Sequence, residues 1–329
     1  MKVVRITESG GPEVLSFDER PRPEPGPGEL LVRVRASALN RADLLQTLGV
    51  YPAPPDVPPD VPGLEYAGEV EAVGPGTRRF RVGDRVMGLV GGGAWSESLT
   101  TREREALPMP AGLSFAEAAA LPEAYLTAYD ALVLQGCLRA GETVLINAVA
   151  SGVGSAAAQL CRASGARVVG TGRSATKLAR AAEWGVTRTL LCEDSPPRFA
   201  HAVREETEGR GADLCLELVG GDYVPESLSA LAPRGRLLLV GLVAGSTTEV
   251  DLGMVLGKRL NIIGTVLRSR PPEEKMALAQ SAERHLLPLF RTGALKPVVD
   301  AVLPMRDIRT AATRLATNDS VGKLVVAWE

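Results

Sequence analysis

Small residues that allow a backbone to approach an anion gather in the stretch A-V-A-S-G-V-G, residues 148–154. In a comparison with the pattern G-x-G-x-x-G, Val149 and Ser151 occupy the first two glycine positions, and only the third glycine is kept. A strand pattern precedes the stretch and an alanine-rich helix pattern follows it, so the first N–H groups of the helix would face a pyrophosphate. We therefore predict a dinucleotide site at Ser151, Gly152, Val153 and Gly154. An ordinary tight turn between strand and helix is the alternative.

The end of the next strand pattern distinguishes between two dinucleotides. An NAD site usually has an acidic residue there, about twenty residues past the glycines, to bond the ribose 2′-hydroxyl. This sequence has no acidic residue from Arg167 until Glu183. Arg173, Ser174 and Lys177 offer two cations and a hydroxyl to a 2′-phosphate instead. We therefore predict NADP(H), although each cation taken singly could be an ordinary surface residue.

The residues that most often bind zinc are few and widely spaced. Cys137, Cys161, Cys192 and Cys215 form no C-x-x-C pair, and the only histidines are His201 and His285. This spacing matches neither a set of zinc ligands nor a disulfide framework. We expect no bound metal, and we expect all four cysteines to be small buried hydrophobic residues in a reducing compartment.

The patterns that must position these residues change along the chain. The first third has short β-type runs at 30–35, 68–74 and 84–90, separated by glycine and proline turns, which predicts a compact all-β unit. From about residue 123, strand and helix patterns alternate, which predicts a parallel sheet covered by helices. The strands are expected at 143–147, 167–170, 214–218 and 236–240, and the helices at 153–164 and 175–184.

After Gly264 the chain has one expected helix, residues 273–291, and then returns to strand-like runs. We therefore predict an α/β domain inserted in a second domain that is built from both ends of the chain. The expected boundaries are 1–122 and 264–329 for the outer domain and 123–263 for the inserted one.

Length and charge restrict the class of protein. At 329 residues, 45% of them hydrophobic, the chain is long enough for two domains with separate cores. Its formal net charge of −2 has no basic stripe, so we do not expect nucleic acid as a partner. The first residues lack the apolar core of a signal peptide, and the longest apolar run, 237–244, is too short to span a bilayer. A cytoplasmic protein with no membrane partner is expected.

Segments along essentially the whole chain resemble one family. They are A-L-N-R-A-D-L-L (38–45), G-L-E-Y-A-G-E-V-E-A-V-G-P-G (63–76), G-D-R-V-M-G-L (83–89), A-A-A-L-P-E-A-Y-L-T-A-Y (118–129), the stretch 148–154, V-G-G-D-Y (219–223) and G-K-L-V-V (322–326). Together they resemble the medium-chain dehydrogenase/reductase superfamily in its zinc-free quinone oxidoreductase (zeta-crystallin-like) branch. The resemblance implies a Rossmann domain, with a doubly wound parallel sheet, inserted in a GroES-like β-barrel domain. It also implies a nicotinamide bound in the cleft between them.

The resemblance also bears on the reaction. The zinc alcohol dehydrogenases of the superfamily have a cysteine where this chain has Asn40 and a histidine where it has Leu64. Without zinc, alcohol oxidation by that route is disfavoured. A quinone needs no metal, because hydride addition gives an aromatised anion that hydrogen bonds can hold. We predict an NADPH-dependent quinone reductase, with an enoyl or 2-alkenal double-bond reductase and a non-catalytic NADPH-binding protein as alternatives.

By position, the resemblance places Asn40 and Asp43 on the floor of the cleft and Tyr51 near the nicotinamide and the acceptor. Helix capping is the alternative for the first pair, with Asn40 as the N-cap and Asp43 three residues on. Tyr51 precedes Pro52 in the proline-dense segment 51–62, so it could instead anchor a loop.

The resemblance adds further cofactor residues and an assembly. They are Thr127 near the nicotinamide ribose, Gly172, Arg173, Ser174 and Lys177 at the adenosine, Gly220, Leu242, Thr265, Val266 and Leu267 beside the nicotinamide, and Lys323 closing the cleft. A surface lysine is the alternative for Lys323. Relatives often have a tyrosine at Cys192, and they have a small residue at Val149. A homodimer is expected, in which the run 236–243 pairs across a two-fold axis.

Overall fold

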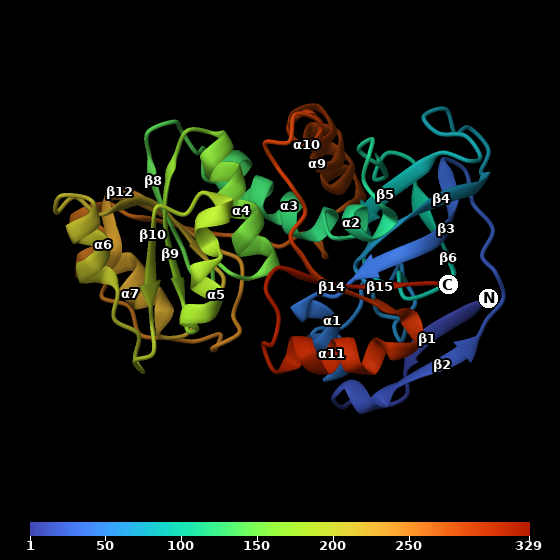
Figure 1. Ribbon diagram of the computed structural model, residues 1–329, viewed down its shortest axis with the longest axis horizontal. Helices are drawn as coiled ribbons and strands as arrows, with labels where there is room; N and C mark the ends of the chain where they lie inside the picture. The colour runs from blue at the N-terminus through green and yellow to red at the C-terminus, as the bar shows by residue number, and fades with distance from the viewer. The chain divides into compact units, whose positions relative to one another are not determined.

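The computed structural model describes residues 1–329, and the chain divides into two compact units (Figure 1). Unit 1 comprises Met1–Leu126 and Leu267–Glu329, and unit 2 comprises Thr127–Val266. Unit 2 is therefore inserted between two stretches of unit 1, and both ends of the chain fold into the same unit.

Unit 2 contains a six-stranded parallel sheet in the order β10-β9-β8-β11-β12-β13. The strands are β8 (Thr143–Ile146), β9 (Arg167–Gly172), β10 (Arg188–Leu191), β11 (Ala212–Glu217), β12 (Leu231–Leu239) and β13 (Asn261–Gly264). This order is that of a doubly wound dinucleotide-binding sheet. The prediction of a Rossmann domain is confirmed.

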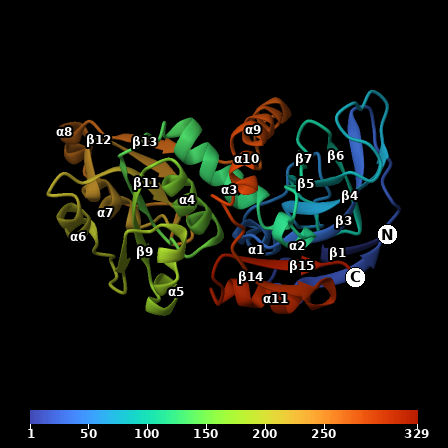
Figure 2. The same ribbon diagram turned by 45° about the horizontal axis from the view of Figure 1, so that its top comes forward.

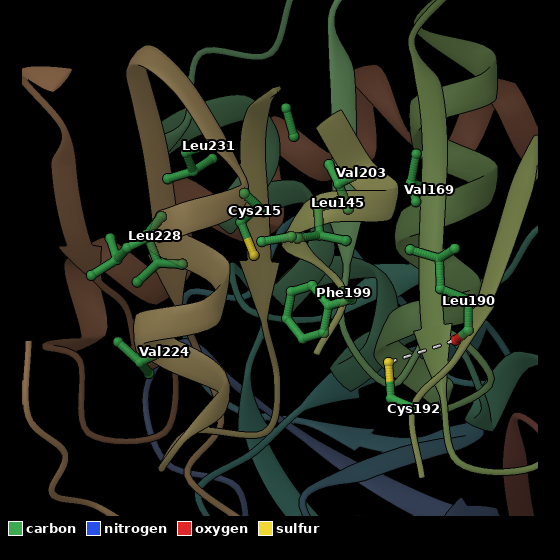
Figure 3. Close-up of a cluster of buried hydrophobic side chains, with 14 residues drawn as sticks. Leu145, Val169, Leu190, Cys192, Phe199, Val203, Cys215, Val224, Leu228 and Leu231 are labelled. Carbon is green, nitrogen blue, oxygen red and sulfur yellow. Dashed lines mark hydrogen bonds between the residues drawn. The ribbon is translucent and has the colours of Figure 1, made fainter. Parts of the chain in front are cut away.

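Helices cover both faces of this sheet, with α4 and α5 on one side and α6 and α7 on the other (Figures 1 and 2). The helices of unit 2 are α4 (Gly152–Ala163), α5 (Ala175–Ala179), α6 (Ala200–Glu206), α7 (Tyr223–Ala230) and α8 (Leu252–Lys258). Every residue of β8 is buried, as expected for a parallel strand covered on both faces. Figure 3 shows the apolar cluster around Phe199 and Leu228 from α6, α7 and the adjoining strands.

The predicted pairing of the run 236–243 across a two-fold axis is wrong. The strand part of this run is the end of β12, which lies between β11 and β13 and has both of its edges paired. Residues beyond Leu239 leave the strand. The edge of the sheet on this side is β13 (Figure 2), so an apolar strand pattern identified a buried central strand and not the edge.

Unit 1 is built around a seven-stranded sheet in the order β14-β15-β3-β4-β5-β7, with β6 also paired to β3. The strands are β3 (Glu29–Ala38), β4 (Glu65–Val73), β5 (Arg85–Leu89), β6 (Ser98–Arg102), β7 (Leu107–Pro108), β14 (Val299–Pro304) and β15 (Lys323–Ala327), beside the hairpin of β1 (Lys2–Ile6) and β2 (Leu15–Glu19). β15 pairs antiparallel with β3, so strands from opposite ends of the chain are neighbours (Figure 1). The predicted GroES-like domain is confirmed.

The remaining helices are α1 (Arg41–Thr47), α2 (Phe115–Ala119), α3 (Pro122–Tyr129), α9 (Pro272–His285), α10 (Leu287–Arg291) and α11 (Ile308–Ala316). The helical segment expected over 273–291 is confirmed, but it is divided into α9 and α10 at Leu286. Pro288 has no N–H to donate to the preceding turn, so a continuous helix would lose a hydrogen bond there. None of the helices combines the length and apolar character that a membrane-spanning segment requires.

The cysteines differ from the prediction in one case. Cys161, Cys192 and Cys215 are buried, as expected, but Cys137 is exposed. Cys137 has a left-handed backbone conformation, with a φ of +49°, in the connection before β8. Its sequence context, outside any apolar periodic run, is that of a connecting segment and gives no reason for burial.

Candidate functional site

The predicted phosphate turn joins β8 to α4. Ser151 is the N-cap of α4, and its hydroxyl accepts a hydrogen bond of 3.1 Å from the N–H of Gly154. The other N–H groups of the first helical turn have no acceptor within the helix, as at any helix start. A Cβ at Gly154 would lie 2.5 Å from the carbonyl oxygen of Ala148, so the third glycine of the pattern is sterically required. The turn therefore has the backbone geometry of an anion site at the N-terminus of a twelve-residue helix.

The bulky residue at the first glycine position of this turn is Val149, which is fully buried. Its N–H donates to the carbonyl of Thr171 in β9 at 3.0 Å. A Cβ on Gly170 of β9 would lie 2.7 Å from Val149 Cγ1. The absence of a side chain at Gly170 thus leaves space for the Val149 side chain, and the turn packs closely against β9.

The residues predicted for the adenosine end lie together at the connection from β9 to α5. Gly172 ends the strand, and the Ser174 hydroxyl caps α5 by accepting from the N–H of Lys177 at 3.4 Å. The Arg173 side chain is exposed, and its charge lowers the pKa of Tyr223, which burial raises. Two cations and one hydroxyl therefore share this turn, with the hydroxyl already used in capping.

Cys192, which stands where relatives often have a tyrosine, packs in the core of unit 2. It lies in the apolar cluster with Leu190 and Phe199, and its Sγ is 3.8 Å from the carbonyl oxygen of Leu190 (Figure 3). Burial raises the pKa of the Cys192 thiol to about 11. The partly buried Tyr223 lies nearby, with its ring centroid 5.7 Å from that of Phe199.

A buried carboxylate, Glu217, braces the carboxyl ends of the central strands, and the sequence analysis did not identify it. Four groups donate to its two oxygens: Val219 N at 2.9 Å, Gly220 N at 3.1 Å, Ser227 Oγ at 2.7 Å and Asn147 Nδ2 at 2.6 Å. The side-chain oxygen Oδ1 of Asn147 in turn accepts from Thr171 Oγ1 at 2.8 Å. Burial raises the pKa of Glu217, and the four hydrogen bonds act against this effect. The network fixes the turn at Gly220, a predicted cofactor residue with a φ of +78°.

Two threonines predicted for the cofactor lie in unit 2. Thr127 is 6% exposed, and its hydroxyl is buried without a hydrogen-bond partner in the protein. Such a group costs about 1–3 kcal/mol unless a ligand or water satisfies it. Thr265 Oγ1 donates to Asp130 Oδ2 at 2.6 Å, and Asp130 opens the π-helical turn that follows α3. The phosphate turn, the two cations after β9 and the unpartnered hydroxyl of Thr127 are each chemically suited to bind part of a dinucleotide.

The other predicted nicotinamide residues divide between the units. Leu242 and Val266 belong to unit 2 and have exposed fractions of 48% and 46%. Leu267 is buried and belongs to unit 1.

In unit 1, Lys323 is the centre of a buried cluster with Asn40 and Glu65. Lys323 begins β15 and is only 5% exposed, so the surface-lysine alternative is wrong. Its Nζ lies 2.6 Å from Glu65 Oε1 and also donates to Asn40 Oδ1 and to the carbonyl of Leu39. Asn40 Nδ2 donates to the same Glu65 oxygen at 2.9 Å, and the backbone N–H of Glu123 donates to the other at 2.8 Å. The side-chain amide of Asn40 is therefore held on both sides by charged groups.

Asp43 is fully buried next to this cluster, where it bonds the backbone of Asn40. Its carboxylate accepts from the N–H of Asn40 at 2.7 Å, which caps α1, and from the N–H of Gly63 at 3.1 Å. Burial raises the pKa of Asp43 to about 7, against the opposing effect of Lys323. Capping accounts for the contact of Asp43 with Asn40, and the second contact joins α1 to Gly63. The Asn40 side chain faces Glu65 and Lys323.

Glu123 and Arg268 are further charged residues of unit 1 that the sequence analysis missed. Burial, and then the Glu65 charge, raise the pKa of Glu123 to about 7. Arg268 is 6% exposed and lies over the ring of the predicted residue Tyr51, 5.0 Å from its centroid. Its contacts join residues that are more than 170 positions away in sequence, so no local pattern could have revealed them. Across residues 1–329, no group of three or more His, Cys, Asp or Glu side chains could hold a metal ion.

Two family models match the chain. "Alcohol dehydrogenase GroES-like domain" matches residues 26–128, and "Zinc-binding dehydrogenase" matches residues 152–283. A quinone oxidoreductase of Pseudomonas aeruginosa is 35% identical over 334 residues, which cover 99% of each chain.

Solved structures extend this similarity to the fold. The CurK enoyl reductase is 28% identical with a TM-score of 0.88, over 100% of this chain and 99% of that one. A mycobacterial protein solved in complex with NADPH is 29% identical with a TM-score of 0.88, over 99% of both chains. The two folds and the shared segments define an oxidoreductase of the nicotinamide-dependent type. The chain belongs to the medium-chain dehydrogenase/reductase superfamily, in its zinc-free quinone oxidoreductase (zeta-crystallin-like) branch, as the resemblance predicted.

Proposed function

We propose that the protein is an NADPH-dependent quinone reductase that acts without a metal. The observation that carries the proposal is the buried cluster around Asn40. At the two positions where zinc alcohol dehydrogenases have ligands, this chain has an amide bonded to Glu65 and Lys323 and the apolar Leu64. The Lys323 ammonium already compensates the Glu65 carboxylate, and an electron-poor quinone needs no Lewis acid to accept a hydride. The similarity to a quinone oxidoreductase supports the same substrate class.

The chain's residues have separate tasks in this proposal. Bound NADPH supplies the hydride from C4 of its nicotinamide. The first N–H groups of α4 bind the pyrophosphate, and Arg173 and Lys177 bind the 2′-phosphate. Thr127 finds on the cofactor the partner that its buried hydroxyl lacks in the protein. Tyr51 offers its hydroxyl to the acceptor oxygen, and catalysis depends mainly on positioning.

Loss of absorbance at 340 nm tests this proposal, with chelator-treated protein and either NADPH or NADH. A small quinone is compared with an enal of similar size. We expect rapid oxidation of NADPH by the quinone and slow oxidation of NADH. Turnover of the enal alone would favour the second candidate, a double-bond reductase, which the similarity to the CurK enoyl reductase supports. Binding of NADPH without turnover of either acceptor would identify a non-catalytic binding protein.

A charge variant tests the cofactor preference. The double variant R173A/K177A should raise the KM for NADPH by about 10-fold or more, because each charge-assisted hydrogen bond contributes about 1.5–3 kcal/mol. The KM for NADH should remain unchanged, since NADH carries no 2′-phosphate. Arg188 is exposed at the start of β10 and provides the matched control R188A, which should leave both values as they are. Equal losses for the two cofactors would contradict the assignment.

We further propose a cytoplasmic homodimer that forms through the β13 edge of the unit 2 sheet. Edge strands present unpaired backbone groups to a second chain. Apolar side chains are exposed on this strand and on the helix that precedes it, with Ile262 of β13 at 47% and Leu252 and Leu256 of α8 at 74% and 80%. Light scattering after size exclusion should give twice the monomer mass. In L256E the measured mass should fall toward that of the monomer. A monomer at all concentrations would exclude this assembly.

A further inference from the structure

Arg268 joins three segments of unit 1, and the proposed reaction assigns it no task. Its Nε donates to the carbonyl of Gly91 at 2.7 Å, and its Nη1 donates to the carbonyl of Tyr51 at 3.1 Å. Its Nη2 donates to Gln46 Oε1 in α1. One buried guanidinium therefore fastens a helix, the start of the proline-dense segment 51–62 and the glycine turn at 91–93.

The same guanidinium also contacts the side chain of Tyr51. The Arg268 Cζ lies 5.0 Å from the centroid of the Tyr51 ring, within the range of a cation–π interaction. Tyr51 is thus held at its backbone carbonyl and at its ring, while its hydroxyl makes no hydrogen bond to the protein. The fixed ring leaves the Tyr51 hydroxyl available to donate a hydrogen bond to a bound molecule.

The charges around Tyr51 link it electrostatically to Arg268. Burial raises the pKa of Tyr51, the Arg268 charge lowers it, and the Glu123 charge raises it. Burial lowers the pKa of Arg268, and Asp43, Tyr51 and Glu123 act against this effect. The pKa of the Tyr51 phenol therefore depends on the presence of the Arg268 guanidinium beside it.

The chemistry at this position requires an arginine. A guanidinium is planar, presents its donors in a fixed fork and stacks on aromatic rings, whereas a lysine ammonium is a compact point charge. The three acceptors from three segments and the contact with the Tyr51 ring fit a guanidinium and not an ammonium.

We propose that Arg268 is a positioning residue that orients the Tyr51 phenol toward the acceptor oxygen and so sets how well the acceptor is bound in the transition state. The use of Tyr51 by an acceptor rests on the proposed function, but the hold of Arg268 on Tyr51 does not. Arg268 itself touches neither acceptor nor cofactor in this role.

The first test is the titration of the Tyr51 phenol by its absorbance at 295 nm. Each protein is compared with its own Y51F counterpart, so that the other tyrosines cancel. In R268Q, Tyr51 should titrate at a higher pH, because the cation that stabilises the phenolate is gone. R268K keeps the charge and should show a smaller shift. The control R79Q removes a part-buried arginine that bonds Glu283 and the carbonyl of Glu103, and it should leave the titration unchanged.

The second test is a double-mutant cycle on kcat/KM for the quinone. R268Q should lower kcat/KM by about 10-fold to 100-fold when Tyr51 is present, since charge-assisted bonds hold it, and should have little further effect in Y51F. The dissociation constant for NADPH should not change. A merely structural role would produce the same loss in both backgrounds, and that result would overturn the proposal.

The two tests separate this inference from the proposed function. If no quinone is turned over, the titration alone decides whether Arg268 holds Tyr51. An unchanged Tyr51 titration in folded R268Q would overturn the proposal whatever the activity. If R268Q does not fold, R268K decides instead, because it keeps the charge and loses the planar fork. A kcat/KM for R268K equal to that of the wild type would then overturn the proposal.

Discussion

Glu65 of unit 1 and Glu217 of unit 2 are both completely buried carboxylates, and their charges are compensated in different ways. Glu65 of unit 1 lies 2.6 Å from the ammonium of Lys323 and also accepts from the Asn40 amide. Glu217 of unit 2 has only neutral donors, two from the backbone and two from side chains. The first charge is balanced by an opposite charge, and the second is balanced by oriented dipoles.

The difference follows what each carboxylate positions. The ion pair holds the side chain of Asn40, so a polar group of the candidate active site keeps one orientation. The neutral network holds the backbone turn after β11, where Gly220 is predicted to face the cofactor. Removal of one partner of a buried ion pair is costly because the remaining charge has no partner. Removal of one neutral donor leaves the other donors of the network in place.

The largest effect is expected from removal of the cation. K323M should lower the free energy of unfolding by about 3–5 kcal/mol, because Glu65 would remain buried and unpaired. Urea denaturation measures this change. A loss below about 1 kcal/mol would mean that the Glu65 charge is compensated in another way, and the contrast with Glu217 would fail.

Two controls sharpen this result. K323M/E65L removes both partners of the ion pair and should recover much of the lost stability, since no unpaired Glu65 charge is then left buried. R306M breaks the exposed pair of Arg306 and Glu329, whose side chains are 64% and 69% exposed, and should change stability by no more than about 1 kcal/mol.

A smaller effect is expected in unit 2 from E217Q. A glutamine presents an NH2 group where one carboxylate oxygen accepts two donors, so the variant should lose about 2 kcal/mol of stability. The turn at Gly220 should loosen, and the dissociation constant for NADPH, followed by its fluorescence, should rise. The exposed Glu205 supplies the control E205Q, which should change neither quantity. A wild-type NADPH affinity in E217Q would show that the network does not brace the cofactor turn.

The pH dependence of stability tests the burial of Glu123 in unit 1. The pKa of Glu123 is raised from 4.5 to about 7 in the folded protein, so the folded state holds a proton that the unfolded chain has already released within this window. Glu123 therefore lowers stability as the pH rises through the window. The wild-type free energy of unfolding should fall between about pH 4.5 and about pH 7. In E123Q this fall should be smaller than in the wild type by on the order of 1 kcal/mol. The control E249Q changes an exposed carboxylate and should leave the pH dependence of the free energy of unfolding as in the wild type. The same unchanged pH dependence in E123Q would contradict the raised pKa of Glu123.

The smallest effect is expected in the phosphate turn. Ala148 has a φ of +51°, which costs an alanine about 1–2 kcal/mol and a glycine almost nothing. A148G should raise the free energy of unfolding by about 0.5–1 kcal/mol after the greater entropy of the unfolded glycine chain is counted. Ala150 in the same turn has no left-handed backbone, so A150G should be destabilising. Destabilisation by both changes would show that the turn does not hold Ala148 in this conformation.

Local patterns predicted much of the fold and one half of the candidate site. The alternation of strands and helices after residue 123 gave the parallel sheet, and the residues of the phosphate turn and of the turn after β9 lie where the patterns placed them. The predicted pairing of the run 236–243 failed, because the position of a strand in its sheet depends on neighbours that periodicity does not describe. The helical segment 273–291 was predicted, but its division at Leu286 was not.

By itself, the sequence determined what depends on neighbouring residues: the strands, the helix starts and the turn that can bind a phosphate. Only the tertiary structure decided which charges meet. The antiparallel register of β15 on β3 pairs Val325 with Ala38, and two residues further along this brings Lys323 to Asn40, 283 positions away in the chain. Arg268 reaches Gln46, Tyr51 and Gly91 in the same way. Burial makes such contacts strong, and burial exists only after the sheet has brought the two ends of the chain together.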